Sequence, residues 1–107
     1  MGYLYKDIEH IPIVGKDNKS FRPKDLYIVM LDGLHGIMKY SINEEFIIPL
    51  EYEDIYQHGN YFVLVKDGKW GLCKIKTDGD VIQTEYFVEM IAKCEYDNIR
   101  DIKKFMK

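Results

Sequence analysis

The sequence predicts a mostly β fold, with two three-stranded antiparallel meanders in a curved or partly closed sheet and a short C-terminal helix. Two Asp-Gly pairs, at 32–33 and 67–68, interrupt runs of apolar residues. Asp-Gly is a strong hairpin signal because both central positions of a type I′ turn take positive φ. The residues around the first pair recur around the second with an offset of 35. The same β-meander is therefore expected twice within a single domain, residues 1–107.

The first meander is expected within residues 26–60, after an N-terminal edge or cap segment over residues 1–25. Residues 26–31 are all apolar and include β-branched and aromatic types, which favour a strand. Residues 37–40 belong to the return strand. The third strand is expected to end at Pro49, because proline cannot donate to the strand ladder.

The second meander is expected within residues 61–99. Residues 61–65 predict its first strand, and residues 69–76 predict the return strand. Asp78-Gly79 then marks a turn, and Val81-Ile82 begins the third strand. The offset between the two units grows to 44 before this unit ends, so its last part carries an insertion of nine residues.

The end of the chain combines a strand with a helix. Residues 84–93 have apolar residues at alternating positions, as in a strand, and also at helical spacing, and we interpret them as a strand. Residues 98–107 predict the helix. Asn98 can cap its N-terminus, and lysines near its end complement the helix dipole.

Several residues occur in an order that is familiar from one protein family. The sequence Lys-Trp-Gly-Leu at 69–72 is followed by Asp78-Gly79 and then by Tyr96-x-x-Ile99. This ordered set resembles the WG (KWG) β-repeat family of bacterial proteins, and a degenerate copy ends at Tyr52-x-x-Ile55. The resemblance covers about three quarters of the chain, from residue 26 onward. It implies a β-repeat module without catalytic residues.

The motif residues of this resemblance are expected to hold the two units together. Glycine after the tryptophan removes a side chain where a neighbouring backbone comes close. Tryptophan supplies a large face for burial, and its indole N–H needs a partner. The structural motif residues are Trp70, Gly71, Gly36, Tyr52 and Tyr96.

Composition and charge exclude several classes of function. The net charge is −3, and acidic and basic residues are mixed in both halves of the chain, which disfavours a nucleic-acid binder. No apolar run approaches the ~20 residues of a membrane span, and the N-terminus lacks the pattern of a signal peptide. Two cysteines without a CxxC spacing predict neither a disulfide scaffold nor a zinc site. We therefore expect a cytoplasmic protein that binds no nucleic acid and no membrane.

No residue pattern predicts catalysis, a metal site or a cofactor. His10, His35 and His58 are scattered and lack the spacing of metal ligands. Cys73 and Cys94 have no basic neighbour in sequence that would lower the pKa of a thiol. We therefore expect a protein that is not an enzyme and holds no cofactor.

The surplus of tyrosine is the most suggestive feature for function. Nine tyrosines exceed the need of a core of this size, and tyrosine is enriched at protein interfaces. The alternative is that amphipathic rings simply cover the faces of a thin sheet. The candidate interface residues are Tyr3, Tyr5, Tyr40, Tyr56 and Tyr61.

The sequence therefore favours a non-catalytic protein-binding module, such as an inhibitor, immunity or anti-defence protein. Lysine outnumbers arginine thirteen to two, a bias typical of AT-rich bacterial or phage genomes. A protein partner would dock on an exposed sheet edge or on a tyrosine-rich face. A homodimer that continues the sheet is a further expectation, because two repeats bury little surface against each other. The alternatives are a carbohydrate or cell-wall ligand module that stacks sugars on Trp70 or tyrosine, and a small hydrolase.

Overall fold

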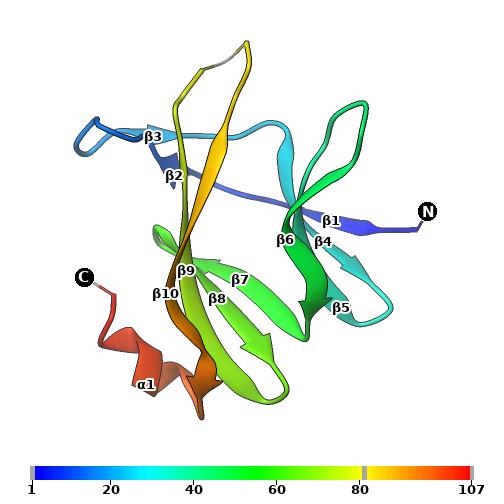
Figure 1. Ribbon diagram of the computed structural model, residues 1–107, viewed down its shortest axis with the longest axis vertical. Helices are drawn as coiled ribbons and strands as arrows, with labels where there is room; N and C mark the ends of the chain where they lie inside the picture. Colours follow the sequence, from blue (N-terminus) through cyan, green and yellow to red (C-terminus); the bar gives the residue numbers. More distant parts are fainter. Residues whose placement is uncertain (1, 81, 107) are drawn as a thin grey trace.

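The computed structural model describes residues 2–80 and 82–106, which form mostly β-strands (Figure 1). The first sheet consists of β1 (Leu4–Asp7), β4 (Leu26–Leu31), β5 (Leu34–Lys39) and β6 (Glu45–Tyr52), in the order β1-β4-β5-β6. The second sheet consists of β7 (Asp54–His58), β8 (Tyr61–Lys66), β9 (Lys69–Thr77) and β10 (Tyr86–Tyr96), in the order β10-β9-β8-β7. A small hairpin pairs β2 (Ile11–Pro12) with β3 (Ser20–Phe21), and helix α1 (Ile99–Lys103) follows β10.

The mostly β fold with a short C-terminal helix is confirmed, but each sheet has four strands where the sequence predicts three. β1 pairs with β4, with Tyr5 opposite Val29, and β7 pairs with β8, with Ile55 opposite Leu64. The N-terminal segment therefore supplies an edge strand of the first sheet. Neither sheet is closed within the described residues.

Both Asp-Gly pairs form the expected tight hairpin turns. Asp32 and Gly33 have φ angles of 53° and 79°, and Asp67 and Gly68 have φ angles of 54° and 72°. Positive φ at both positions is the condition for a type I′ turn. The β4–β5 and β8–β9 hairpins are thus set by the same local chemistry.

Strand β6 bulges where it passes a glycine of β5. Ile37 lies opposite Ile48 and His35 lies opposite Tyr52, so β6 has more residues than β5 over this stretch. Gly36 lies between the two pairs, and a Cβ at this position would lie 2.9 Å from the carbonyl oxygen of Ile48. The bulged backbone therefore occupies the space that a side chain at position 36 would need.

The second sheet repeats this bulge at the corresponding place. Leu72 lies opposite Ala92 and Trp70 lies opposite Tyr96. A Cβ on Gly71 would lie 2.8 Å from the carbonyl oxygen of Ala92. The two sheets therefore have the same strand pairing in this region, with a bulge opposite a glycine in each.

Two predicted strand boundaries are wrong. β6 does not end at Pro49 but continues to Tyr52. Proline is tolerated there because it lies in the bulge of an edge strand. The strand predicted to begin at Val81-Ile82 is β10, and it begins at Tyr86 instead. Ile82 lies in the loop before it and is 94% exposed, while Val81 lies outside the described residues. The strand prediction for residues 84–93 is confirmed from Tyr86 onward.

The extra residues of the second unit extend β9 and β10 into a long hairpin arm that reaches the first sheet (Figure 1). Nζ of Lys39 donates to the carbonyl oxygen of Thr84 at 2.8 Å. The hydroxyl of Tyr86 donates to the carboxylate of Asp25. The arm thus ties the two sheets together at the end opposite to the Asp-Gly turns.

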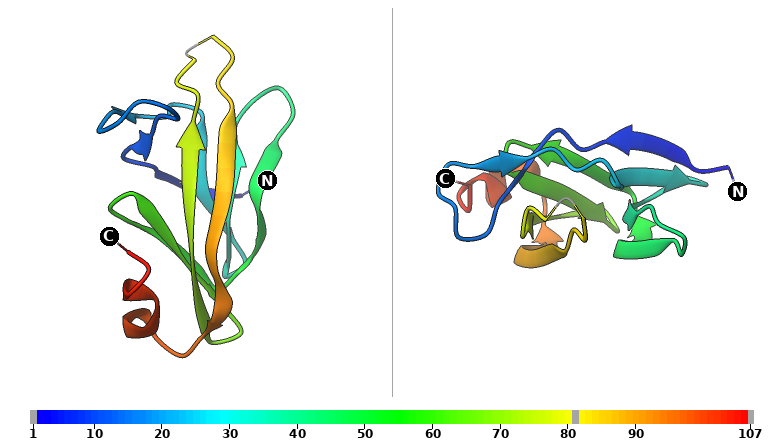
Figure 2. Two further views of the ribbon diagram at one scale, coloured as in Figure 1. Left: turned by 60° about the vertical axis from the view of Figure 1, so that its left-hand side comes forward. Right: turned by 90° about the horizontal axis from the view of Figure 1, so that it is seen from above.

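The two sheets stack against each other, and α1 covers the far side of the second sheet (Figure 2). Only Glu53 separates β6 from β7, so the chain passes directly from one sheet into the next. The stack is flat, with extents of 40 × 38 × 16 Å. A core between the sheets includes Ile28, Ile37, Ile48, Ile55, Phe62, Leu64, Cys73 and Ile75. A second core beneath α1 includes Tyr61, Val63, Leu72, Ala92 and Ile102.

Candidate functional site

The outer side of the first sheet carries a group of aromatic rings, here named the outer aromatic face: Tyr3, Tyr5, Tyr27, Tyr40 and Phe46. The rings of Tyr5 and Tyr27 meet edge to face with centroids 5.6 Å apart. Tyr3 contacts Tyr5 at 6.2 Å and Phe46 at 6.3 Å in the same manner. Aromatic quadrupoles favour this geometry. Tyr40 lines one hollow together with Tyr5 and Tyr27, so the five rings form a continuous surface.

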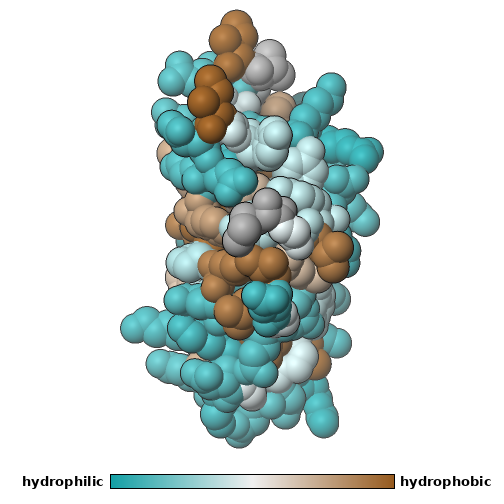
Figure 3. Space-filling model, turned by 90° about the vertical axis from the view of Figure 1, so that its right-hand side faces the viewer, coloured by the Kyte–Doolittle hydropathy of each residue, from teal (hydrophilic) through white to brown (hydrophobic). Residues whose placement is uncertain are grey.

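Strand alternation places these rings on one side of the sheet. Tyr27 and Val29 are alternate residues of β4 and therefore point to the same side. Tyr5 lies opposite Val29, and Phe46 lies opposite Met38. Val29 and Met38 are both 0% exposed. The aromatic rings thus cover an aliphatic floor. The view of this side of the molecule shows pale and hydrophobic side chains across its middle, with hydrophilic side chains above and below them (Figure 3).

The rings themselves remain open to solvent. Tyr40 is 59% exposed, Tyr5 47% and Phe46 37%. Contiguous exposed apolar surface of this kind marks interaction sites. Partial desolvation, followed by the charge of Glu44, raises the pKa of the Tyr5 hydroxyl. An ordinary tyrosine hydroxyl is already neutral at physiological pH, so Tyr5 can donate a hydrogen bond to a partner with or without this shift.

The structure separates the five candidate interface residues into two groups. Tyr3, Tyr5 and Tyr40 lie together on the outer aromatic face. Tyr61 is buried in the core beneath α1, and Tyr56 packs against that core. Tyr61 therefore belongs to the interior of the second sheet and Tyr56 lies half-buried beside it, so neither belongs to the outer aromatic face.

Two members of the face, Tyr27 and Phe46, were not among the candidates from sequence. The alternation of Tyr27 with Val29 is visible in sequence, but β4 is apolar on both sides, so the pattern does not tell which side faces the core. The pairing of Tyr5 with Val29 joins residues far apart in the chain. Local sequence patterns cannot supply such a contact.

Trp70 is half-buried, with its side chain against the core beneath α1. It lies opposite Tyr96 in the β9–β10 ladder and packs against the core beneath α1. Phe105, which follows α1, contacts the ring of Tyr96 edge to face at 5.7 Å. A sugar-stacking platform needs an open ring face, and Trp70 is only partly exposed, which disfavours the carbohydrate alternative.

The groups that a hydrolase would need are not brought together. Burial, with a smaller contribution from Cys94, raises the pKa of the Cys73 thiol to about 12, so a reactive thiolate is disfavoured. Nε2 of His35 lies 3.7 Å from the nearest oxygen of Asp54, beyond hydrogen-bond reach. Within residues 2–80 and 82–106, no cluster of three or more His, Cys, Asp or Glu residues is placed to hold a metal ion.

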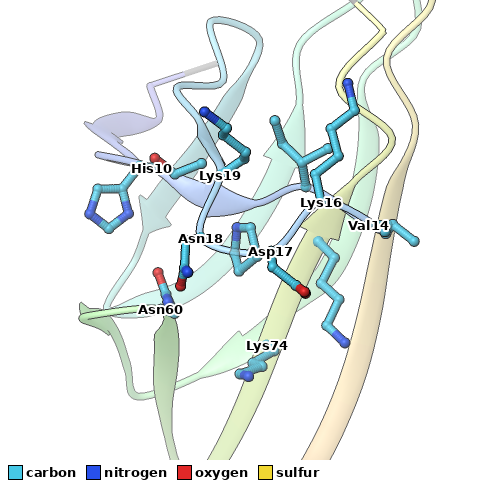
Figure 4. A pocket seen from close by; sticks show the side chains of 13 residues that line it. His10, Val14, Lys16, Asp17, Asn18, Lys19, Asn60 and Lys74 are labelled. Atoms are coloured by element: carbon cyan, nitrogen blue, oxygen red, sulfur yellow. The ribbon is translucent and has the colours of Figure 1, made fainter.

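A polar hollow of about 550 Å³ lies between the β2–β3 loop and the upper part of β9. Four lysines line it: Lys16, Lys19, Lys74 and Lys76. In Figure 4 the labelled lysine side chains point in different directions rather than toward one centre. Lys76 pairs with Glu89 at 3.1 Å, and Nζ of Lys74 lies 5.0 Å above the ring of Tyr61. The arrangement does not form a convergent anion site.

Comparisons with family models, with curated proteins and with solved structures find no match to this chain. The resemblance to WG repeats therefore stays a prediction. No helix in the described part of the chain has the length and apolar character needed to cross a membrane.

Proposed function

We propose that this protein is a non-catalytic binding module whose protein partner docks on the outer aromatic face. One observation carries the proposal: one end of the stack is a continuous aromatic surface, whereas α1 covers the other end. Tyrosine suits such a role because it offers a large contact area with few rotatable bonds. Inhibitors, immunity proteins and anti-defence proteins of bacteria and phages act in this way, and we propose a cytoplasmic role of that kind.

The free edge of β10 is a weaker candidate for docking. Phe87 and Met90 are exposed there, but Glu89 and Lys93 are exposed charged residues on the same strand. Charges on an edge strand oppose the addition of a further strand. On the outer aromatic face, by contrast, the apolar side chains are contiguous, because Tyr3, Tyr5, Tyr27 and Phe46 meet edge to face. This face therefore supports docking better.

The proposal can be tested by comparing two variants of the exposed surface. Tyr5→Ser combined with Tyr40→Ser removes the two most exposed rings of the face, and Ile82→Ser changes an even more exposed apolar residue in the loop before β10. Each protein is used as bait in a lysate of the source organism, and the captured protein is then purified and its affinity measured by calorimetry. Loss of one central aromatic anchor typically weakens binding by about 2 kcal/mol, or roughly 30-fold.

We expect the Ile82 variant to retain a stoichiometric protein that the tyrosine variant loses. Equal binding by both variants would contradict docking on the outer aromatic face. Absence of any stoichiometric protein with the unchanged chain would contradict the binding-module proposal itself.

A further inference from the structure

The outer aromatic face occupies the same place in the first sheet that a buried face occupies in the second. Val29 and Leu64 each precede the aspartate of a hairpin turn by three residues. Tyr5 lies opposite Val29 as Ile55 lies opposite Leu64. By the same correspondence, Tyr27 takes the place of Phe62.

In the second sheet this face is fully covered by the first sheet. Ile55, Phe62 and Leu64 are buried in the core between the sheets. Their partners across that core are aliphatic side chains of the inner face of the first sheet: Ile28, Ile37 and Ile48. Within this chain, therefore, the surface that packs against such a face is the aliphatic face of another antiparallel sheet.

Helix α1 covers the second sheet where a third sheet would otherwise stack. The residues that correspond to the inner face of the first sheet are Val63, Leu72 and Ala92, and they pack against Ile102 of α1. Tyr52-x-x-Ile55 leads into β7, whereas Tyr96-x-x-Ile99 leads into α1. The helix therefore ends the stack at one side, while the other side remains open.

We infer that the partner at the outer aromatic face presents an aliphatic β-sheet face, and that α1 prevents the chain from supplying such a face to another copy of itself. This inference rests on the proposed function and adds the kind of partner. Without α1, the aliphatic face of one copy would fit the outer aromatic face of the next. Such a head-to-tail contact repeats from copy to copy and would produce larger assemblies, either closed rings or open filaments according to its rotation.

The composition of the outer aromatic face fits a reversible contact. Tyrosine replaces isoleucine at positions 5 and 40, as the corresponding residues are Ile55 and Ile75. A tyrosine ring buries apolar surface against a partner, and its hydroxyl tolerates water when the partner leaves.

The test uses the full-length chain and detaches the helix by substitution. Ile102 is buried beneath α1, so Ile102→Asp is expected to release the helix. We expect analytical ultracentrifugation to show the unchanged protein as a monomer and the Ile102 variant as a series of larger species. Adding Tyr5→Asp and Tyr40→Asp to the Ile102 variant should restore the monomer, whereas adding Ile82→Asp should not.

Fluorescence of Trp70 and circular dichroism show whether each variant remains folded. If Ile102→Asp unfolds the chain, Phe105→Asp weakens the same contact from its half-buried rim. A mixing experiment then uses the unchanged protein as a chain terminator, since it offers an outer aromatic face but no free aliphatic face. It should shorten the assemblies, and the Tyr5→Asp, Tyr40→Asp protein should leave them unchanged.

Three results would overturn the inference. The first is assembly that persists when the outer aromatic face is altered. The second is a folded helix-detached variant that stays monomeric. The third is a dimer of the unchanged protein that the tyrosine substitutions dissociate, because a second copy would then occupy the face directly. A partner captured through the tyrosines, together with no assembly of the helix variants, would leave the proposed function intact and refute only this inference.

Discussion

Two glycines, Gly36 and Gly71, make the bulged crossings of the two sheets feasible. A Cβ at these positions would lie 2.9 Å and 2.8 Å from a backbone oxygen of the neighbouring strand. We expect Gly36→Ala and Gly71→Ala each to lower the free energy of unfolding by about 1–3 kcal/mol, the usual range for overpacking. Urea unfolding measures this change. Gly2→Ala is the control because nothing lies within 4 Å of its added Cβ; equal midpoints for all three variants would refute the steric explanation.

The thiol of Cys73 should be unreactive in the native protein. Burial raises its pKa to about 12, so almost no thiolate is present at neutral pH. We expect a thiol reagent to label Cys73 only when the chain is unfolded, as mass spectrometry of labelled peptides can show. Labelling of the native protein at the rate of the unfolded chain would mean that the core between the sheets opens readily.

The residues of the outer aromatic face are only partly predictable from sequence. The excess of tyrosine indicates an interface, and three of the five candidates, Tyr3, Tyr5 and Tyr40, lie on that face. Tyr56 and Tyr61 lie on the side of the second sheet that α1 covers. Composition reveals that tyrosine is in surplus. Whether a given tyrosine is exposed depends on which surface of its sheet the rest of the chain covers, and composition does not reveal this.

Among the elements, the strands next to tight turns are predicted well and the insertion is not. The Asp-Gly turns fix the β4–β5 and β8–β9 hairpins locally. Val81-Ile82 has the composition of a strand start, but the backbone amide of Ile82 donates to the carboxylate of Asp80 at 2.9 Å. This side-chain acceptor competes with a strand ladder, so the chain forms a loop before β10.

The loop between β9 and β10 should loosen in acid. The carboxylate of Asp78 accepts hydrogen bonds from the amides of Asp80 at 2.9 Å and Glu85 at 3.3 Å, and these bonds lower its pKa. A lowered folded-state pKa stabilises the loop above the ordinary aspartate value of about 3.9, and this contribution is lost as the pH falls through the folded-state value. Amide hydrogen exchange should therefore show that the protection factors of the Asp80 and Glu85 amides fall as the pH is lowered through this range.

A matched comparison separates this effect from general acid unfolding. The amide of Asp101 donates to the neutral side chain of Asn98 at 3.3 Å, so its protection should not change over the same pH range. Asp78→Ala should remove the acid dependence at Asp80 and Glu85. Persistence of that dependence in the variant would assign it to another group.

At the scale of the whole molecule, the repeat is predictable and the stacking is not. The offset of 35 residues predicts two similar hairpins, and the structure contains them with the same turns and bulges. The sequence does not show that the inner face of the first sheet packs against the face of the second sheet that corresponds to the outer aromatic face. That arrangement depends on the direct passage from β6 into β7, which sets the two sheets one behind the other.

This shared core predicts that the two sheets unfold together. Ile28 belongs to the first sheet and is 1% exposed within the core between the sheets. We expect Ile28→Ala to lower the free energy of unfolding by about 2–5 kcal/mol. Trp70 lies in the second sheet, so its fluorescence transition should shift as far as the circular dichroism transition. Ile42→Ala, at a fully exposed isoleucine, should shift neither transition. If Ile28→Ala moved only the circular dichroism transition, the sheets would unfold independently, and the core between them would not couple the two ends of the stack.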